Sequence, residues 1–219
     1  MIASAPTGPV EVPDLVRAFS EAPEAVWENE IGGLTFRDGD RYLKWNPAGS
    51  GIDLEDERAR LAWAAPHTPV PEVLDLGRDD HGQVLVTRAL PGAGAVTDRW
   101  LAQPDVAVRA IAEGLRALHE TLPVASCPWV WRDGGTDVVV CHGDPCAPNT
   151  IVGDDGRWSG HVDLGSLGTA DRWSDLAVCS MSLDWNFGEG WQPVFFAAYG
   201  IERDEDRIRH YRALWNAEP

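Results

Sequence analysis

The sequence predicts an α+β protein with two lobes: a small antiparallel-sheet lobe with one helix (residues 1–90) and a larger, mostly helical lobe (residues 91–219). Three observations support this prediction. β-prone runs and turn signals are concentrated in the first lobe, and helical periodicity dominates the second. A Gly-rich stretch, LPGAGA, lies between them and is typical of a hinge. A chain of 219 residues can also bury a sizeable core.

The first lobe is expected to contain two hairpins and a helix. Residues 33–46 place β-prone residues on both sides of an Asp-Gly-Asp turn, in which glycine tolerates positive φ. Residues 53–65 have a helical pattern that Asp53 can cap and Pro66 can end. The runs EVLDLG and QVLVTR, separated by RDDHG, predict the second hairpin.

The second lobe is expected to open with a buried amphipathic helix over residues 105–119, because apolar residues recur there at helical spacing. A strand and a hairpin follow, and three more helical patterns cover residues 172–183, 191–199 and 204–215. Trp185 in SLDWNFGEGW could line a pocket, but core packing is the expected role for an aromatic residue in such a segment.

Charge and composition restrict the partners. The formal net charge is −17, from 35 acidic and 18 basic residues, so neither nucleic acid nor an anionic membrane is expected as a partner. The charge suits a cationic small molecule, although acidity that serves only solubility gives the same composition. No run approaches the roughly 18 apolar residues of a membrane span, and the N-terminus lacks a signal-like pattern, which predicts a cytoplasmic protein.

The four cysteines are expected to be reduced thiols in or near the core. Their spacing matches no zinc-binding pattern, and the chain shows no sign of export to an oxidising compartment. They are Cys127, Cys141, Cys146 and Cys179.

The stretch VVVCHGDPCAPNTIVGDDGRWSGHVDLG, residues 138–165, carries the chemistry. A Gly-Asp-Asp-Gly turn folds its last two strands onto each other, which places Asn149 and Asp163 at the open end, near the loop that contains Asp144. Three oxygen-bearing side chains are thereby brought together. Two hard oxygen ligands beside a free carboxylate are what magnesium-assisted phosphoryl transfer requires.

HGDPCAPN followed by VDLGSLGTADRWSDLA resembles the catalytic and metal-binding segments of the aminoglycoside 3'-phosphotransferases, a branch of the protein-kinase-like fold. The resemblance implies that Asp144 is the catalytic base and that Asn149 and Asp163 are magnesium ligands. It also implies that His142 supports the loop. Asp171 and Asp175 would tie the following helix to that loop.

The resemblance covers most of the chain from about residue 27, because DLEDERARLAWAAPHTPVPEVLDLG and YGIERDEDRIRHYRALW also look like family segments. It implies an ATP- and magnesium-dependent kinase that transfers the γ-phosphate to a hydroxyl of an aminoglycoside or a similar cationic compound. The residues 1–90 would then form the nucleotide-binding lobe, and residues 91–219 the catalytic and acceptor-binding lobe.

The nucleotide site is expected to depend on Lys44, the only lysine in the chain, in the second strand of the first hairpin. A kinase-like lysine is held by a helix glutamate so that it points at the α and β phosphates. At 100° per residue, Glu57 falls on the edge of the apolar helix face, whereas Glu55 points away from it, so Glu57 is the predicted partner. Adenine would lie against backbone groups near Ala89, Leu90 and Gly92.

Simpler interpretations exist for the same residues. Asp144 and Asp163 could be turn carboxylates that cap backbone amides. Lys44 and Glu57 could form a surface ion pair of little consequence. The Gly-Gly step at residues 32–33 could cover phosphates or be a plain turn, since it is not a G-x-G-x-x-G.

A metallohydrolase is a further alternative, because His142, Asp144, His161 and Asp163 resemble alternating metal ligands. No third histidine motif follows them, however. The strand that carries Lys44 and the helix that carries Glu57 would also have no role in such an enzyme.

Two segments depart from the family pattern. Residues 120–136 are shorter than the helical insertion that family members usually carry there to wall the acceptor pocket. At the C-terminus, Trp215 and Asn216 stand where the family commonly has an acidic pair, with Glu218 beyond. A nucleotide-binding protein without aminoglycoside kinase activity and a kinase of another hydroxyl metabolite therefore stay as alternatives. The sequence leaves the oligomeric state open between monomer and weak dimer.

Overall fold

The computed structural model describes residues 3–217. The chain divides into two compact units, residues 1–63 with 71–89 and residues 64–70 with 90–219. Residues 64–70 were expected in the first lobe, but they belong to the second unit. The reason is a contact with the predicted hairpin, because the backbone N–H of His161 donates to the carbonyl oxygen of Pro69 at 3.3 Å.

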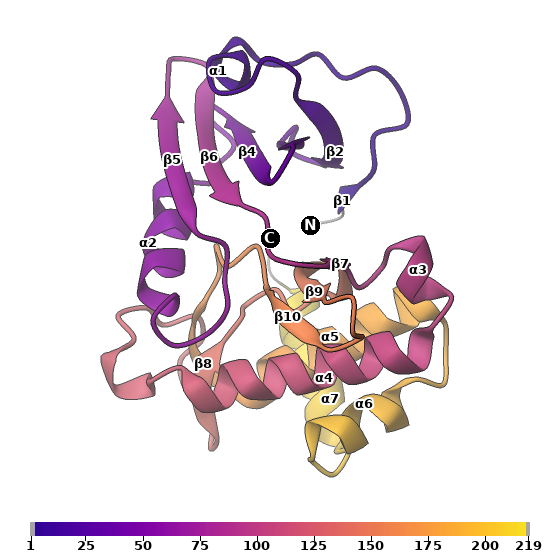
Figure 1. Ribbon diagram of the computed structural model, residues 1–219. Helices are drawn as coiled ribbons and strands as arrows, with labels where there is room; N and C mark the ends of the chain where they lie inside the picture. The colour runs from indigo at the N-terminus through magenta and orange to yellow at the C-terminus, as the bar shows by residue number, and fades with distance from the viewer. Residues whose placement is uncertain (1–2, 218–219) are drawn as a thin grey trace. The chain divides into compact units, whose positions relative to one another are not determined.

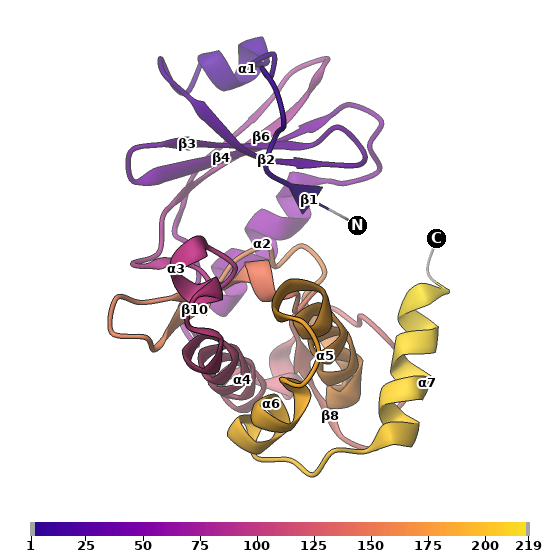
Figure 2. The same ribbon diagram turned by 90° about the vertical axis from the view of Figure 1, so that its right-hand side faces the viewer.

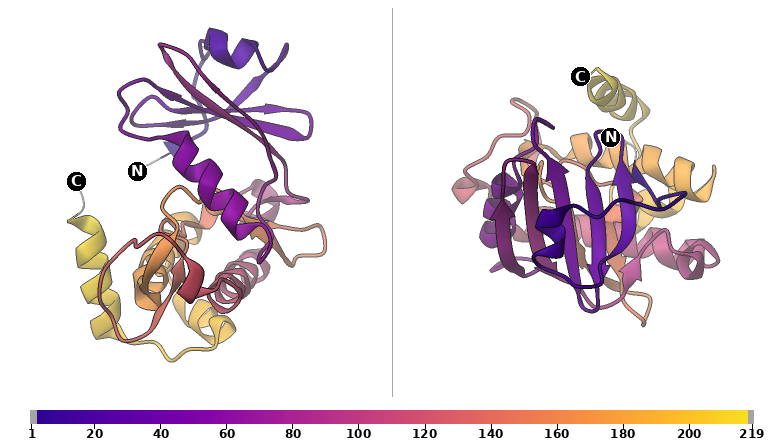
Figure 3. Two further views of the ribbon diagram at one scale, coloured as in Figure 1. Left: turned by 90° about the vertical axis from the view of Figure 1, so that its left-hand side faces the viewer. Right: turned by 90° about the horizontal axis from the view of Figure 1, so that it is seen from above.

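The first unit is built on a six-stranded sheet in the order β1-β2-β3-β4-β6-β5, in which every neighbouring pair is antiparallel (Figure 1; Figure 3, right). Both predicted hairpins are present as β3–β4 and β5–β6, whereas β1 and β2 were not predicted. The strands are β1 (Ala3–Ser4), β2 (Glu24–Asn29), β3 (Leu34–Asp38), β4 (Arg41–Pro47), β5 (Val73–Arg78) and β6 (Gly82–Arg88).

Two helices, α1 (Asp14–Arg17) and α2 (Leu54–Ala64), lie on opposite faces of this sheet (Figure 2). α2 begins after Asp53, whose side chain accepts the backbone N–H of Glu55 at 3.0 Å, so the predicted cap is confirmed. Successive side chains of a strand point to opposite faces. Leu43 of β4 therefore joins the apolar cluster on the α1 side, which sends its neighbour Lys44 to the α2 side.

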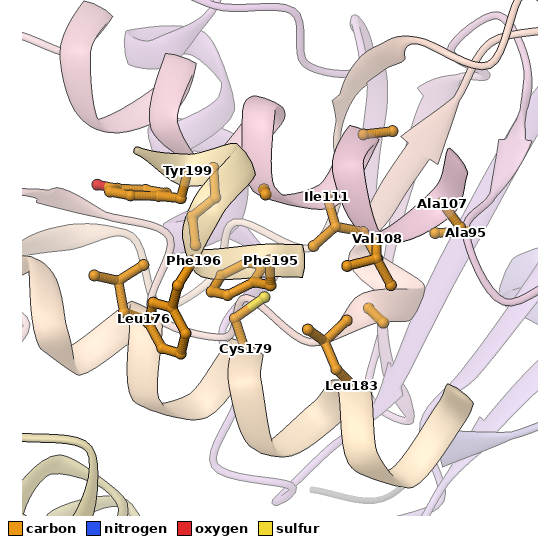
Figure 4. Close-up of a cluster of buried hydrophobic side chains, with 14 of the residues drawn as sticks. Ala95, Ala107, Val108, Ile111, Leu176, Cys179, Leu183, Phe195, Phe196 and Tyr199 are labelled. Atoms are coloured by element: carbon orange, nitrogen blue, oxygen red, sulfur yellow. The ribbon is translucent and has the colours of Figure 1, made fainter. Parts of the chain in front are cut away.

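The second unit is mainly helical, as predicted, and its core lies between α4, α5 and α6 (Figure 4). The periodic apolar residues of the expected helix, such as Val108 and Ile111 of α4, are buried there. Gly200 ends α6 in the left-handed conformation, and the Asp204 side chain caps α7. The helices are α3 (Asp98–Leu101), α4 (Pro104–Thr121), α5 (Arg172–Phe187), α6 (Gln192–Tyr199), α7 (Glu205–Asn216), and the 3₁₀ helices η1 (Val124–Ser126) and η2 (Ala147–Asn149).

Two small sheets complete the second unit. β9 (Thr150–Val152) and β10 (Trp158–His161) form the predicted hairpin, which the short strand β7 (Ala93–Gly94) extends. β8 (Val138–Cys141) pairs antiparallel with β11 (Gly168–Asp171), a strand that was not predicted. The loop between β8 and β9 is thus held at both ends by sheet structure.

The short segment before β8 is ordered by β11 and by the last helix. Trp131 donates its backbone N–H to the carbonyl oxygen of Thr169 at 3.0 Å, and Thr169 donates in turn to Trp129 at 2.9 Å. The Trp131 ring meets that of Trp215 edge-on, with centroids 6.4 Å apart. Glu218, the acidic residue expected beyond Trp215, lies outside the described residues. Within residues 3–217 no helix has the length and apolar character that crossing a membrane demands.

Candidate active site

The loop that follows β8 contains the candidate base. Asp144 is half-buried, and its Oδ1 atom is buried without a hydrogen-bond partner among the described residues. A buried carboxylate oxygen without a donor is costly, so such an atom commonly marks a site that a ligand completes. Asp144 is therefore placed as a group that can accept a proton or a hydrogen bond from a bound molecule.

A buried aspartate of α5 holds this loop. Asp175 has no exposed side-chain surface, and its carboxylate accepts the backbone N–H of His142 at 2.6 Å and that of Gly143 at 3.1 Å. Asp171 caps the same helix by accepting from Trp173 at 3.0 Å. The two residues immediately before Asp144 are thus fixed by their backbone.

Gly143 must be glycine for two reasons. Its φ is +88°, and a Cβ atom there would lie 2.2 Å from the carbonyl oxygen of Ser166, which is backbone and cannot rotate away. The loop therefore approaches the segment after β10 more closely than any other residue type permits. This close approach brings the stretch with Asp144 next to the stretch with Asp163.

Hydrogen bonds join the segments of the two expected metal ligands. The Asn149 Nδ2 atom donates to the backbone oxygen of Asp144 at 2.9 Å, which leaves its Oδ1 as the atom for a ligand. The Asn149 carbonyl accepts the N–H of Val162 at 3.0 Å, directly before Asp163. Asp163 has a φ of +62° and is the one non-glycine residue with positive φ in the described chain. Such strain is typical of functional sites.

His142 supports the loop, as the resemblance implied. Its Nδ1 accepts the N–H of Asp144 at 3.3 Å, and its Nε2 donates to the carbonyl of Val162 at 3.0 Å. Both nitrogens are therefore occupied by backbone. His161 is 2% exposed, and burial, with His142 next to it, lowers the pKa of its ring well below the usual value. This geometry argues against the metallohydrolase alternative.

The one group of potential metal ligands among the described residues lies elsewhere. His119, Cys141 and Asp175 are all buried and offer atoms within 4.8 Å of one another. Asp175, however, already accepts three hydrogen bonds, from His119 and from the two loop amides. We therefore interpret the group as structural. Sequence analysis missed His119, because a histidine near the end of an amphipathic helix gives no local signal.

The thiols near the loop are poor nucleophiles. All four cysteines are unpaired, as expected. Burial raises the pKa of Cys146 strongly, and the neighbouring Asp144 carboxylate raises it further. Cys146 is therefore a protonated thiol beside the candidate base.

In the first unit, Lys44 contacts the glutamate that helix geometry favoured. Its Nζ lies 2.7 Å from Oε2 of Glu57, whose side chain is only 7% exposed, while that of Lys44 is 25% exposed. Glu55 instead pairs with Arg58 of the same helix, with Nε 2.8 Å from Oε2. A lysine oriented by a buried carboxylate is suited to binding phosphate.

Part of the segment expected to hold adenine is already hydrogen-bonded within the protein. The Ala89 N–H donates to the Asp40 carbonyl at 2.7 Å, so this donor is already used and cannot serve adenine. Gly92 has a φ of +113°, and a Cβ there would lie 2.2 Å from the Val152 oxygen. Close packing against β9 thus explains why residue 92 is a glycine. Leu90 is half-buried in the second unit.

Trp185 does not pack in the core, and the expectation that it would is wrong. Its side chain is 63% exposed. α5 faces the core through Leu176, Cys179 and Leu183 (Figure 4), and Trp185 lies about 200° around the helix from Leu183. The aromatic content of the segment gave no information on which face would be buried.

Comparison with known proteins identifies the family. The model of the phosphotransferase enzyme family matches residues 27–136 and 125–211. The chain belongs to this family. A streptomycin 3''-kinase of Streptomyces griseus is 35% identical over 251 aligned positions, which cover 87% of this chain and 90% of that protein. An aminoglycoside 3'-phosphotransferase of Streptomyces fradiae is 34% identical, with 77% and 81% covered. The inferred resemblance is thereby confirmed.

Solved structures confirm the protein-kinase-like fold. The aminoglycoside phosphotransferase APH(3'')-Id of Streptomyces rimosus matches with a TM-score of 0.74 and 30% identity, over 90% of this chain and 93% of that one. Its complex with ADP and streptomycin matches with a TM-score of 0.71. Our chain is therefore a phosphotransferase with this fold.

The comparisons also show that one relative contains segments which this chain lacks. The alignment with the streptomycin kinase has 251 positions, more than the 219 residues of this chain, so that relative contains segments that are missing here. The two pieces of the family match overlap at residues 125–136. This is the segment that was expected to be short, and it runs beside β11.

Proposed function

We propose that this phosphotransferase is a magnesium-dependent kinase that transfers the γ-phosphate of ATP to a hydroxyl of an aminoglycoside. The observation that carries the proposal is the buried, unpartnered Oδ1 of Asp144 on a loop whose backbone Asp175 fixes. General-base catalysis needs such a carboxylate in a defined position. In this proposal residues 1–90 bind the nucleotide, and residues 91–219 carry the base and bind the acceptor.

The residues that would hold magnesium fit that ion. Asn149 offers Oδ1, because its Nδ2 is committed to the Asp144 backbone, and Asp163 offers a carboxylate held at positive φ. Amide and carboxylate oxygens are the ligands magnesium prefers. When bound, the ion would neutralise charge on the phosphates.

The chain's own groups would carry out the remaining steps. Lys44, oriented by Glu57, would bind the phosphates, and backbone groups around Leu90 would hold adenine. The Ala89 N–H is excluded from that role by its bond to Asp40. Asp144 would accept the proton of the acceptor hydroxyl as that oxygen attacks the γ-phosphorus and the bond to ADP breaks. Such an enzyme would work in the cytoplasm, where ATP is available.

The acceptor is proposed to be cationic. The formal net charge of −17 favours amine- or guanidine-bearing molecules, and streptomycin is bound to one of the structural relatives. Streptomycin is therefore the first acceptor to test. The short segment 120–136 and Trp215 in place of an acidic residue distinguish this acceptor region from the family pattern. A changed preference among aminoglycosides would follow from them.

The test is ADP release by the purified protein with ATP and magnesium, in the presence of streptomycin, kanamycin or neomycin. We expect release that requires both the drug and magnesium. Asp144→Asn keeps the shape of the side chain but removes the base, and it should reduce release by about 10³-fold. Thermal stabilisation by ATP and magnesium without any turnover would instead favour a nucleotide-binding protein.

A further inference from the structure

A buried chain of polar side chains connects α5, α6 and α4 in the second unit. The Arg172 Nη1 atom lies 3.3 Å from the Tyr199 hydroxyl, which lies 2.7 Å from Nδ1 of His119. Nε2 of the same histidine lies 2.9 Å from Oδ2 of Asp175. The side chains of His119 and Asp175 are fully buried, and Tyr199 is 2% exposed. No role in the proposed reaction has yet been assigned to Arg172, Tyr199 or His119.

The direction of these hydrogen bonds follows from the groups themselves. An ionised carboxylate only accepts, so Nε2 of His119 must donate to Asp175. We take the His119 ring as neutral, in which case Nδ1 carries a lone pair and the Tyr199 hydroxyl donates to it. Arg172 only donates, so the Tyr199 oxygen accepts from it. All three bonds therefore point from a guanidinium towards a buried carboxylate, and bonds aligned in this way strengthen one another.

The surroundings keep each group in its place. Burial raises the pKa of Tyr199, which keeps the hydroxyl proton that the chain needs. Arg172 is held from its other side by Asp137, with Nη2 2.9 Å from Oδ1. At the far end, Asp175 accepts the backbone N–H groups of His142 and Gly143. The chain thus ends on the two residues that precede Asp144.

We propose that Tyr199 and Arg172, acting through His119, are positioning residues for Asp144. They hold the His119 ring in the orientation in which its Nε2 hydrogen meets Asp175, and this hydrogen bond fixes the carboxylate of Asp175 against the backbone of the catalytic loop. The proposal rests on the proposed function of Asp144 as the base. None of the three residues touches the candidate base, so their effect is transmitted entirely through Asp175.

Removal of the Tyr199 hydroxyl tests the chain with little change in packing. In Tyr199→Phe the Nδ1 atom loses its donor, so a buried acceptor is left unpaired and the ring loses the contact that orients it. The hydrogen bond from Nε2 to the Asp175 carboxylate would then be less well aligned, and the loop would be held less firmly. We expect kcat to decrease on the order of 10- to 100-fold, because small misplacements of a catalytic group have effects of this size. The KM for ATP should stay within about twofold, since Lys44 and Glu57 lie in the other unit.

Two measurements separate positioning from a general loss of stability. Nitrogen NMR of ¹⁵N-histidine-labelled protein should show His119 protonated on Nε2 in the wild type, and in Tyr199→Phe the chemical shifts of both ring nitrogens should change because their hydrogen bonds change. Tyr42→Phe, the same change in β4, is the matched control and should alter neither the spectrum nor kcat. His119→Gln supplies an amide donor with no tautomers, so Tyr199→Phe should cost little more in that background.

Several results would overturn the proposal. They are a wild-type His119 protonated on Nδ1, a Tyr199→Phe variant with wild-type kcat, and equal losses from Tyr199→Phe in both backgrounds. Failure of the proposed function would look different, because wild-type protein would then release no ADP with any acceptor. The ring-nitrogen signals of His119 and the amide signals of His142 and Gly143 would still show whether Tyr199 controls the loop.

Discussion

The candidate residues of the two units are held in place in different ways. In the first unit, Lys44 is oriented by a side-chain contact with Glu57, and a quarter of the lysine side chain is exposed. In the second unit, the loop with Asp144 is fixed through its backbone by Asp175, which is fully buried, and by the close approach of Gly143. Substitutions around Lys44 should therefore reduce activity less than substitutions around Asp144.

The largest effect is expected at Asp163. Asp163→Gly removes the carboxylate and retains a residue that adopts the observed φ of +62° without strain. Loss of one proposed magnesium ligand should reduce kcat by about 10³-fold or more, as loss of a preorganised charge-stabilising group does. ADP release measured over a range of magnesium concentrations checks this. Thermal unfolding is the control and should show no loss of stability. A variant within tenfold of the wild type would contradict the assignment of Asp163 as a ligand.

A pair of glycine substitutions compares the two units directly. Gly143→Ala places a Cβ 2.2 Å from a backbone oxygen at positive φ, and we expect about 100-fold lower activity from the displaced loop. Gly33→Ala, in the turn between β2 and β3, places a Cβ 2.5 Å from side-chain atoms of Asn29 and Asn46. Side chains can shift where backbone cannot, so the loss there should be about tenfold or less. Equal losses of activity would refute the contrast between the two units.

Much of the architecture follows from local sequence patterns. The hairpin β3–β4, the cap at Asp53 and the helix α4 were all predicted, because turn residues, capping residues and helical periodicity act over a few positions. The contact between Lys44 and Glu57 was also expected. A single angle around α2 was sufficient to prefer Glu57 over Glu55, since one face of that helix must be apolar.

The features that were missed depend on residues far apart in the chain. His119 meets Tyr199 across 80 positions and Asp175 across 56, and no periodicity encodes such a contact. Residues 168–171 form the strand β11 only because they pair with β8. The Ala89 N–H, in the segment predicted to hold adenine, donates to Asp40, a partner that becomes a neighbour only when the sheet forms.

A smaller effect is expected when Lys44 loses its charged partner. Glu57→Gln keeps a hydrogen-bond acceptor but removes the negative charge that orients the lysine. We expect the KM for ATP to increase roughly tenfold, since a hydrogen bond to a charged group contributes about 1.5–3 kcal/mol and a neutral one only about 1 kcal/mol. Glu55→Gln is the matched control, because Glu55 pairs with Arg58 and lies away from Lys44. An identical KM for ATP in both variants would remove Glu57 from the nucleotide site.

The smallest effect is expected at Trp185, an exposed residue of the second unit. One turn before it on α5, the Ser182 hydroxyl accepts the N–H of Ala147, in the loop that contains Asp144. On another side of the helix, Arg212 of α7 donates to Ser180 at 2.9 Å. At 100° per residue, Trp185 points about 60° away from Ser182, and it is exposed.

An exposed indole in this position offers a surface for a cationic ring, because the face of the aromatic system attracts ammonium and guanidinium groups. Trp185→Ala should therefore raise the KM for the aminoglycoside about three- to tenfold, which corresponds to the roughly 0.5–1.5 kcal/mol of such contacts. Neither the KM for ATP nor the unfolding temperature should change. Leu101→Ala, at another exposed apolar residue, is the control and should leave the acceptor KM unaltered. If both variants bind the acceptor like the wild type, Trp185 takes no part in recognition, and selectivity must come from other residues of the second unit.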